Sequence, residues 1–331
     1  MSQAETLPAS TVKPSDALVW LSRYATLAAL VALIAFNIAF TNHFLSIQTL
    51  NVNLTQVATI VIVGVGMTLV IATGGIDLSV GSLMAISGAI APIIFLGKIV
   101  KIDEIHVAVA VAMIASVAVA GVFGWFNGWL ITRFRIQPII ATLVLFIAGR
   151  GIAQVSTNGN LQPFKLGEFS WIGLGRWFGV PVQVVIMLVL VAVAAWVLRR
   201  SLFGRQILAI GGNERAARLA GIPVASVKRW VYCISGLCSG IAGLVVIAIN
   251  SSSDANLVGL GMELDAIAAV AVGGTLLSGG RATVAGTLIG ALIIQLVRYT
   301  LLANGVPDDV AKLVKAGLIV AAVWLQGQGK A

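Results

Sequence analysis

The chain alternates between long apolar segments and short polar ones. Apolar runs of roughly 20 residues with few charges are long enough to cross a bilayer as helices. The predicted spans are 17–40, 54–73, 79–96, 107–131, 138–155, 182–198, 230–249, 265–277, 282–301 and 310–325. The pattern therefore predicts an all-α, polytopic membrane protein with about ten transmembrane helices.

The polar segments divide the chain around this helical part. Residues 1–16 form a polar arm, residues 17–326 the transmembrane domain and residues 327–331 a short tail. The first apolar run, 17–40, is long enough to span, and no cleavage signal precedes it. We expect it to remain as the first helix.

Composition and charge support this assignment. The mean hydropathy is +1.03, and only 10% of the residues are charged, whereas soluble domains carry about 25%. The net charge of +9 lies in short basic runs between apolar segments, without the extended patch that nucleic-acid binding requires. The basic runs instead indicate topology, because loops rich in Lys and Arg stay in the cytoplasm. They place both termini there.

The most basic stretch, 199–229, holds seven of the 21 Lys and Arg residues and is the expected intracellular contact point. Asn213 can cap a helix N-terminus, Glu214 suits its first turn, and Gly221 followed by Pro223 ends it. This predicts a helix of about two turns, Glu214–Ala220. So short a helix is marginal in water and should be docked against something.

Two interpretations of this short helix stay open. Ala216 and Ala220 share one face with Ala217 beside them, so they form a smooth strip that could enter a groove in a partner. Alternatively, Arg215 and Arg218 hold anionic lipid head groups at the membrane surface.

Glycine-rich turns interrupt the apolar pattern at two places. The segment GGIDLSVG at 74–81 is echoed by GGTLLSGG at 273–280, which is either an internal repeat or a coincidence in a chain with 36 glycines. Broken helices at matching depth are typical of transport paths. The span 265–277 is accordingly either a full span or a partly unwound one.

Several polar residues lie inside the apolar spans, where they need partners or a wet cavity. The candidates for a substrate path are Asp77, Asn127, Arg150, Gln154, Glu263 and Asp265.

Each candidate also has a structural alternative. Asp77 could simply cap the helix that begins near Ser79. Asn127 lies between Trp125 and Trp129, which suit either a sugar path or an interfacial aromatic belt.

The charged candidates could pair with one another. Arg150 and Gln154, four residues apart, share a helical face, as a lining pair would. Glu263 or Asp265 could pair with Arg150 or Arg298, in an ion pair that is either structural or functional.

Motifs for catalysis are not found. No His/Cys/carboxylate cluster has metal-ligand spacing, no glycine-rich loop ends in the Lys-Ser/Thr of a nucleotide site, and only two His residues occur. We expect no catalytic residue, metal or cofactor.

Three segments together carry a family resemblance: GMTLVIATGGIDLSVGS at 66–82, GGNERAARLAGI at 211–222 and ELDAIAAVAVGGTLLSGGR at 263–281. They closely resemble the membrane permeases of bacterial monosaccharide ABC importers, such as the ribose, xylose and galactofuranose systems. The similarity extends from about residue 53 to residue 325. IQPIIATLVLFIAGRGIAQ at 136–154, with DAN at 254–256, is most similar to the galactofuranose permease.

The resemblance implies a multi-pass protein of the bacterial inner membrane that imports a monosaccharide, a hexose or pentose in furanose form. It implies two permease subunits, identical or different, a periplasmic sugar-binding protein, and an ATPase with two fused nucleotide-binding halves that hydrolyses the ATP. It also implies that residues 213–222 couple the permease to that ATPase. The coupling residues would be Asn213, Glu214, Ala216, Ala217, Ala220 and Gly221.

Two other classes of transporter remain open at this point. An ion-coupled secondary carrier for a small polar solute would use intramembrane carboxylates and need no ATP. A passive channel would work without a binding protein.

Overall fold

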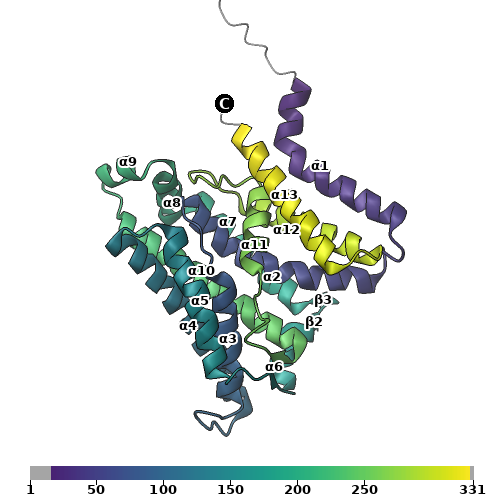
Figure 1. Ribbon diagram of the computed structural model, residues 1–331, viewed down its shortest axis with the longest axis vertical. Helices are drawn as coiled ribbons and strands as arrows, with labels where there is room; N and C mark the ends of the chain where they lie inside the picture. Colours follow the sequence, from purple (N-terminus) through teal and green to yellow (C-terminus); the bar gives the residue numbers. More distant parts are fainter. Residues whose placement is uncertain (1–15, 329–331) are drawn as a thin grey trace, which may run out of the picture.

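The computed structural model describes residues 16–328, so the predicted arm lies outside them except for Asp16, as do residues 329–331 of the tail. The described part contains thirteen α-helices and four two-residue strands (Figure 1). The helices are α1 (Asp16–Phe40), α2 (Ile47–Ala72), α3 (Val80–Phe95), α4 (Ile105–Phe134), α5 (Pro138–Ser156), α6 (Gly167–Leu174), α7 (Val182–Arg200), α8 (Leu202–Gly212), α9 (Glu214–Leu219), α10 (Val224–Asn250), α11 (Met262–Val272), α12 (Val284–Ala303) and α13 (Asp308–Gln328).

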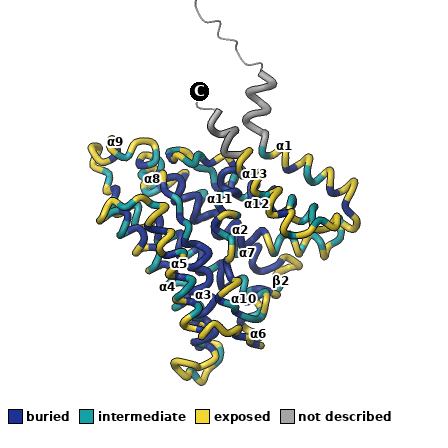
Figure 2. The backbone as a smooth tube through the Cα atoms, in the orientation of Figure 1, coloured by how far each residue is buried: buried dark blue, intermediate teal, exposed yellow. Residues whose placement is uncertain are grey.

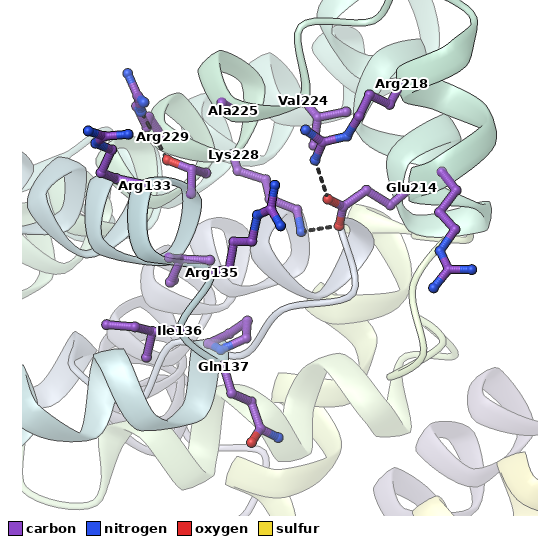
Figure 3. A pocket seen from close by; sticks show the side chains of 14 residues that line it. Arg133, Arg135, Ile136, Gln137, Glu214, Arg218, Val224, Ala225, Lys228 and Arg229 are labelled. Carbon is purple, nitrogen blue, oxygen red and sulfur yellow. Dashed lines mark hydrogen bonds and ion pairs between the residues drawn. The ribbon is translucent and has the colours of Figure 1, made fainter.

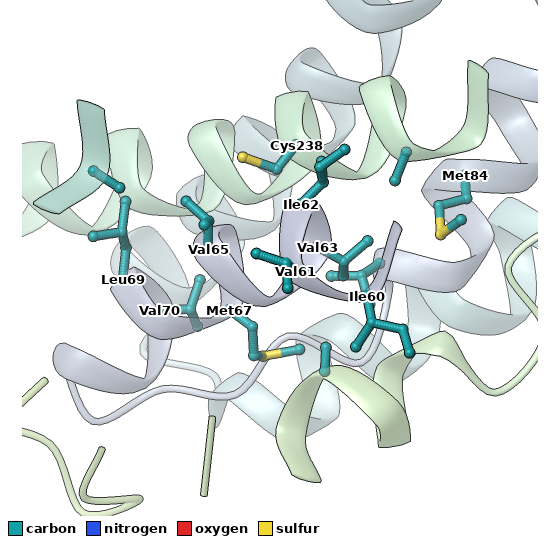
Figure 4. Packing of buried hydrophobic residues seen from close by; sticks show 14 of the residues in the cluster. Ile60, Val61, Ile62, Val63, Val65, Met67, Leu69, Val70, Met84 and Cys238 are labelled. Atoms are coloured by element: carbon teal, nitrogen blue, oxygen red, sulfur yellow. The ribbon is translucent and has the colours of Figure 1, made fainter. Parts of the chain in front are cut away.

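The helix α2 forms the centre of the molecule. Every residue from Val57 to Ala72 is buried, and Figure 2 shows this buried core surrounded by more exposed helices. The apolar side chains of α2 pack against α10, for example near Cys238, and also against α7, α11 and α12 (Figure 4). A helix that is apolar on all sides suits either a protein core or a membrane span, and here the other elements are arranged around α2 and cover it.

Small residues bring α4 and α10 into close contact. A side chain at Gly124 would overlap Tyr232 O, and one at Gly236 would overlap Ala120 O. Residues without side chains let two helix backbones approach closely, which is how helices commonly pack in membranes. The small-residue spacing at Gly236 and Gly240 is therefore a packing feature, as its pattern predicts.

Each of the ten predicted spans has a helix in the structure, but they are not equally long. Six described helices, α2, α4, α5, α7, α10 and α12, are long and apolar enough to cross a membrane. The helix α11 has only 11 residues, about 16 Å at 1.5 Å per residue, or half of a bilayer core. Of the two alternatives for the 265–277 span, a full span or a partly unwound one, the structure contains the partly unwound one, since the helix ends at Val272.

Other boundaries differ from the prediction because amphipathic helices lie where the sequence indicates loops. The basic stretch contains α8 as well as α9, and α10 begins at Val224 instead of Trp230. The long connection after α5 contains α6. These segments carry polar residues, which weaken the apolar signal but do not prevent a helix with one buried side.

Four short strands join the loops on one side of the molecule. The strand β1 (Gln162–Pro163) pairs with β4 (Ser252–Ser253), and β2 (Arg176–Trp177) pairs with β3 (Val180–Pro181), both antiparallel. In Figure 1, β2 and β3 lie near α6 on the side away from α9, whereas α13 ends on the α9 side. Lys98 of the α3–α4 connection donates to Gln162 of β1 at 2.9 Å, so that connection lies beside β1.

The contact between α4 and α10 gives a stability test. Replacing Gly124 by Val should destabilise the protein by about 1–3 kcal/mol, because the added side chain has no room between the helices. Gly151→Val on α5 is the matched control, since nothing lies within 4 Å of a Cβ at that position. Thermal unfolding in detergent should show a lower melting temperature for Gly124→Val alone. Equal melting temperatures would contradict this account of the packing.

Candidate functional site

The short helix α9 projects from one side of the molecule and is capped as the sequence predicts. The Asn213 side chain accepts a hydrogen bond from Ala216 N at 3.0 Å. At the other end Gly221 has a φ of +82°, and Ile222 N donates to Ala217 O at 3.1 Å. A left-handed glycine with this hydrogen bond is the common Schellman end of a helix. Both predicted ends are confirmed.

The side chain of Glu214 connects α9 to α10. It accepts from Lys228 Nζ at 2.6 Å and from Arg218 at 2.9 Å (Figure 3). Burial by itself would raise the pKa of Glu214, but the hydrogen bonds and charges of Lys228 and Arg218 outweigh burial and lower this pKa. The carboxylate therefore stays ionised at neutral pH and holds the short helix in place.

The outer face of α9 differs from the predicted alanine strip. Ala217 is buried in the core of the subunit, because it lies on the face of α9 that packs inward, so its placement on the docking strip is wrong. Ala216 and Ala220 are exposed, as expected. Between them projects Leu219, whose side chain is 90% exposed. Leu219 was missed because the alanine pattern alone suggested a smooth surface.

The two glycine-rich turns form the same backbone motif. At the end of α2, Gly74 has a φ of +78° and Gly75 N donates to Val70 O. At the end of α11, Gly274 has a φ of +81° and Thr275 N donates to Val270 O. Both are Schellman ends. The structural match aligns Gly74 with Gly274, one residue out of register with the echo in the sequence.

These two turns meet at the end of α8. Gly280 N donates to Ala72 O at 3.1 Å, which links the α11–α12 connection to the end of α2. Gly211 lies against both groups, and a side chain there would overlap Ala72 O and Gly280 N. The stretch that carries α9 therefore touches the ends of α2 and of the α11 turn directly, backbone against backbone.

Asp77 and Asn127 lie together in a buried network behind the first turn. Asp77 accepts from Ser79 N at 3.0 Å, from Ser79 Oγ at 2.6 Å and from Ser235 Oγ at 2.8 Å. Asn127 donates to Ser79 Oγ at 3.0 Å. Both residues are completely buried within the subunit. The network joins α4 and α10 to the residues that start α3.

Arg150 and Gln154 hold the loop that follows α10. Arg150 donates to Ala255 O at 2.8 Å and to Val258 O at 2.6 Å, and Gln154 donates to the exposed Asn256 side chain at 2.7 Å. Arg150 thus binds backbone carbonyls, and among the described residues it forms no ion pair with Glu263 or Asp265. Carbonyl oxygens satisfy a guanidinium inside a membrane as well as a carboxylate does.

The two acidic residues of α11 have separate surroundings. Asp265 pairs with Lys315 of α13. Of the two arginines considered as partners, Arg298 instead binds Asp308 at 3.0 Å. Glu263 is buried beside Gly81, and its Oε2 has no hydrogen-bond partner among the described residues. Glu263 and Arg150 therefore share one region, with Gly81 between them.

Comparison with known proteins identifies the family. Residues 49–323 match the family described as the permease component of the branched-chain amino acid transport system. The chain belongs to this permease family. It is accordingly a multi-pass protein of the inner membrane, as its apolar helices also indicate.

Similar proteins cover nearly the whole permease. The ribose import permease protein RbsC of Escherichia coli K12 is 43% identical over 93% of this chain and 95% of its own length. The galactofuranose transporter permease protein YtfT of the same organism is 39% identical over 83% and 78%. The fructose import permease protein FruF of Bifidobacterium longum is 34% identical over 82% and 76%. No solved structure is similar enough to count as a match.

These relatives confirm the resemblance to monosaccharide permeases without selecting one sugar. They are permease subunits of transport systems and not enzymes. The ribose permease is more similar to the chain than the galactofuranose permease is, so the sugar stays a proposal.

The contact at Gly211 predicts a specific sensitivity. Gly211→Ala should push α8 away from α2 and weaken the Gly280–Ala72 hydrogen bond, whereas Gly212→Ala should not, because nothing lies within 4 Å of a Cβ there. Amide hydrogen exchange at Gly280 should become faster only in Gly211→Ala. Unchanged exchange in that variant would show that α8 does not press on the two turns.

The Glu214 contact predicts a pH dependence. Because its pKa is lowered below 4.5, the ionised carboxylate stabilises α9 fully above that pH, and this stabilisation is lost as the pH falls through the lowered value. Amide exchange across residues 214–220, corrected for the intrinsic pH effect, should stay slow from pH 7 to pH 5 and rise in stronger acid. Glu214→Gln should exchange fast at every pH; slow exchange in this variant would argue against the ion pairs.

Proposed function

We propose that the protein is the transmembrane permease subunit of an ATP-driven importer and forms the path for a monosaccharide. The observation that carries this proposal is α9, a capped helix whose exposed Leu219 projects from the surface. The end of α8, directly before α9, contacts the end of α2 and the α11–α12 connection through Gly211. A helix such as α9 suits insertion into a groove of an ATPase. The names of the similar ribose, galactofuranose and fructose permeases support a sugar as substrate.

The contact surface on α9 consists of Ala216, Leu219 and Ala220. Asn213, Glu214 and Gly221 hold the helix in position, and Ala217 anchors it to the core. A movement of the ATPase groove would move α8 with α9, since Glu214 and the core contacts prevent α9 from rotating freely. Gly211 would then press on the ends of two membrane helices at once, and this is a direct way to open or close a path between them.

The orientation follows from this proposal. The side that bears α9 is cytoplasmic, both termini lie there, and the ten predicted helices make up the transmembrane part, with α11 as a half-span. The loop held by Arg150 and Gln154 then faces the periplasm, where a sugar-binding protein delivers the substrate.

We place the entrance of the path near this loop. Gln154, Asn256, Arg150 and Glu263 lie close together there, and amide, guanidinium and carboxylate groups are suited to sugar hydroxyls. Asp265 lies on α11 two residues after Glu263 and is paired with Lys315 on α13. Asp77 and Asn127, which are completely buried, would act on the path by fixing the start of α3.

The proposed partners are an ATPase with two fused nucleotide-binding halves, a second permease subunit, identical or different, and a periplasmic sugar-binding protein. The ATPase hydrolyses the ATP, and the permease contributes no catalytic residue. The substrate class is a pentose or a hexose in furanose form.

Reconstitution tests the proposal. Proteoliposomes with the permease, the ATPase and the binding protein should take up sugar only with ATP. Leu219→Ser should reduce uptake about tenfold or more, because burying a leucine in a groove contributes about 1.5–3 kcal/mol. Leu202→Ser is the control, since Leu202 is also exposed and begins α8, outside α9.

The alternatives predict different results in the same vesicles. Uptake driven by an ion gradient without ATP would identify a secondary carrier, and uptake without the binding protein would identify a channel. Full uptake by Leu219→Ser would show that α9 does not contact the ATPase through Leu219.

A further inference from the structure

A large basic cavity lies beside α9, between the α4–α5 turn and the start of α10. Its volume is about 830 Å³. Its lining includes six basic side chains and one acidic one, Glu214 (Figure 3). The basic ones are Arg133, Arg135, Arg215, Arg218, Lys228 and Arg229.

Only part of this positive charge is neutralised within the protein. Glu214 binds Arg218 and Lys228, and Arg229 Nε donates to Thr132 Oγ1 at 3.0 Å. Across the described part of the chain, no hydrogen bond or ion pair engages the side chains of Arg133 and Arg135. Guanidinium groups gathered without a counter-charge repel one another, so the cavity suits an anion.

Exposed aromatic residues are sequence neighbours of three arginines that line the cavity. Phe134 is 58% exposed and lies between Arg133 and Arg135, and Trp230, 55% exposed, follows Arg229. Trp129 packs edge-on against Phe134 with ring centroids 5.3 Å apart. Aromatic side chains next to basic ones are typical of the boundary between lipid tails and head groups. This pattern favours a lipid over a soluble protein as the occupant.

The helix next to the cavity offers a surface for lipid tails. Along α5, Ile140, Val144 and Ile147 are 54%, 60% and 66% exposed, and they share one face of the helix because they are three or four residues apart. A head group bound between Arg133 and Arg135 would therefore have its acyl chains beside an apolar surface. Basic pockets of this kind bind anionic lipids in other membrane proteins.

We propose that this cavity binds the phosphate head group of an anionic phospholipid from the leaflet on the α9 side. The phosphate lies between the arginines of the α4–α5 turn and those of α9. The lipid thereby joins α9 to the α4–α5 turn, and no hydrogen bond or ion pair among the described residues links these two elements directly. This site depends on membrane insertion and not on the transport function proposed above.

Lipid binding by defined variants tests the site. The purified protein is placed in nanodiscs of phosphatidylcholine with increasing phosphatidylglycerol, and native mass spectrometry counts the phosphatidylglycerol molecules that stay bound. Each basic side chain near an anionic lipid contributes about a fivefold increase in affinity. The double variant Arg133→Gln with Arg135→Gln should therefore bind phosphatidylglycerol about 25-fold more weakly.

Two further variants make the result specific. Arg199→Gln with Arg200→Gln removes two exposed arginines that end α7 outside the cavity, and it should bind like the wild type. Arg133→Lys with Arg135→Lys keeps the charge and should lose only a small part of the affinity. Phosphatidylcholine should not be retained by any variant.

Three outcomes would overturn the proposal. Equal retention of phosphatidylglycerol by the Gln variant would show that the cavity does not hold the lipid. Displacement of the lipid by an equal concentration of glycerol 3-phosphate would identify a site for free phosphate. If the Gln variant retains the lipid but no longer assembles with the ATPase in detergent, the cavity is a protein-docking surface.

Discussion

Hydrocarbon offers no hydrogen bonds, so each backbone N–H and C=O group within the membrane needs a partner in the protein. Most of this chain meets the constraint with continuous helices. The turns after α2 and α11 meet it with left-handed glycines that return their amide groups to the preceding helix. At the end of α2, the carbonyl oxygen of Ala72 accepts a hydrogen bond from the backbone N–H of Gly280 in the α11–α12 connection. The two interruptions therefore depend on each other. Gly211 is needed because only bare backbone fits between the two turns, whereas Gly74 and Gly274 are needed because their φ is positive.

Much of the fold follows from the sequence, because long apolar runs carry a strong signal. The helix α2 and the caps of α9 are examples, since residues such as Asn213 and Gly221 act through local geometry. The helix α8 was not predicted, because an amphipathic segment with polar residues resembles a loop when only the apolar content is considered. The helix α6 was not predicted, because its eight residues are too few to give a periodic signal. Their inward faces are defined by neighbours that are distant in the sequence.

The candidate site shows the same division. Local spacing correctly predicts a short helix at 214–220, yet the face on which Ala217 lies depends on how α9 packs against the core. Charge alone suggests an ion pair for Arg150, whereas the loop after α10 supplies carbonyl oxygens that no sequence pattern reveals. The role of Gly211 was equally hidden, since a glycine becomes informative only when the backbones that approach it are known.

The way Arg150 is held has a consequence for the outer surface. A guanidinium remains charged at any physiological pH, and backbone carbonyls do not titrate, so the bonds from Arg150 to Ala255 O and Val258 O do not depend on acidity. Because the bonds lie partly inside the protein, they are also less screened by salt than surface ion pairs are. In the orientation proposed above, a loop fastened in this way keeps its shape while the medium on that side of the membrane changes, so the proposed entrance is insensitive to acidity and salt.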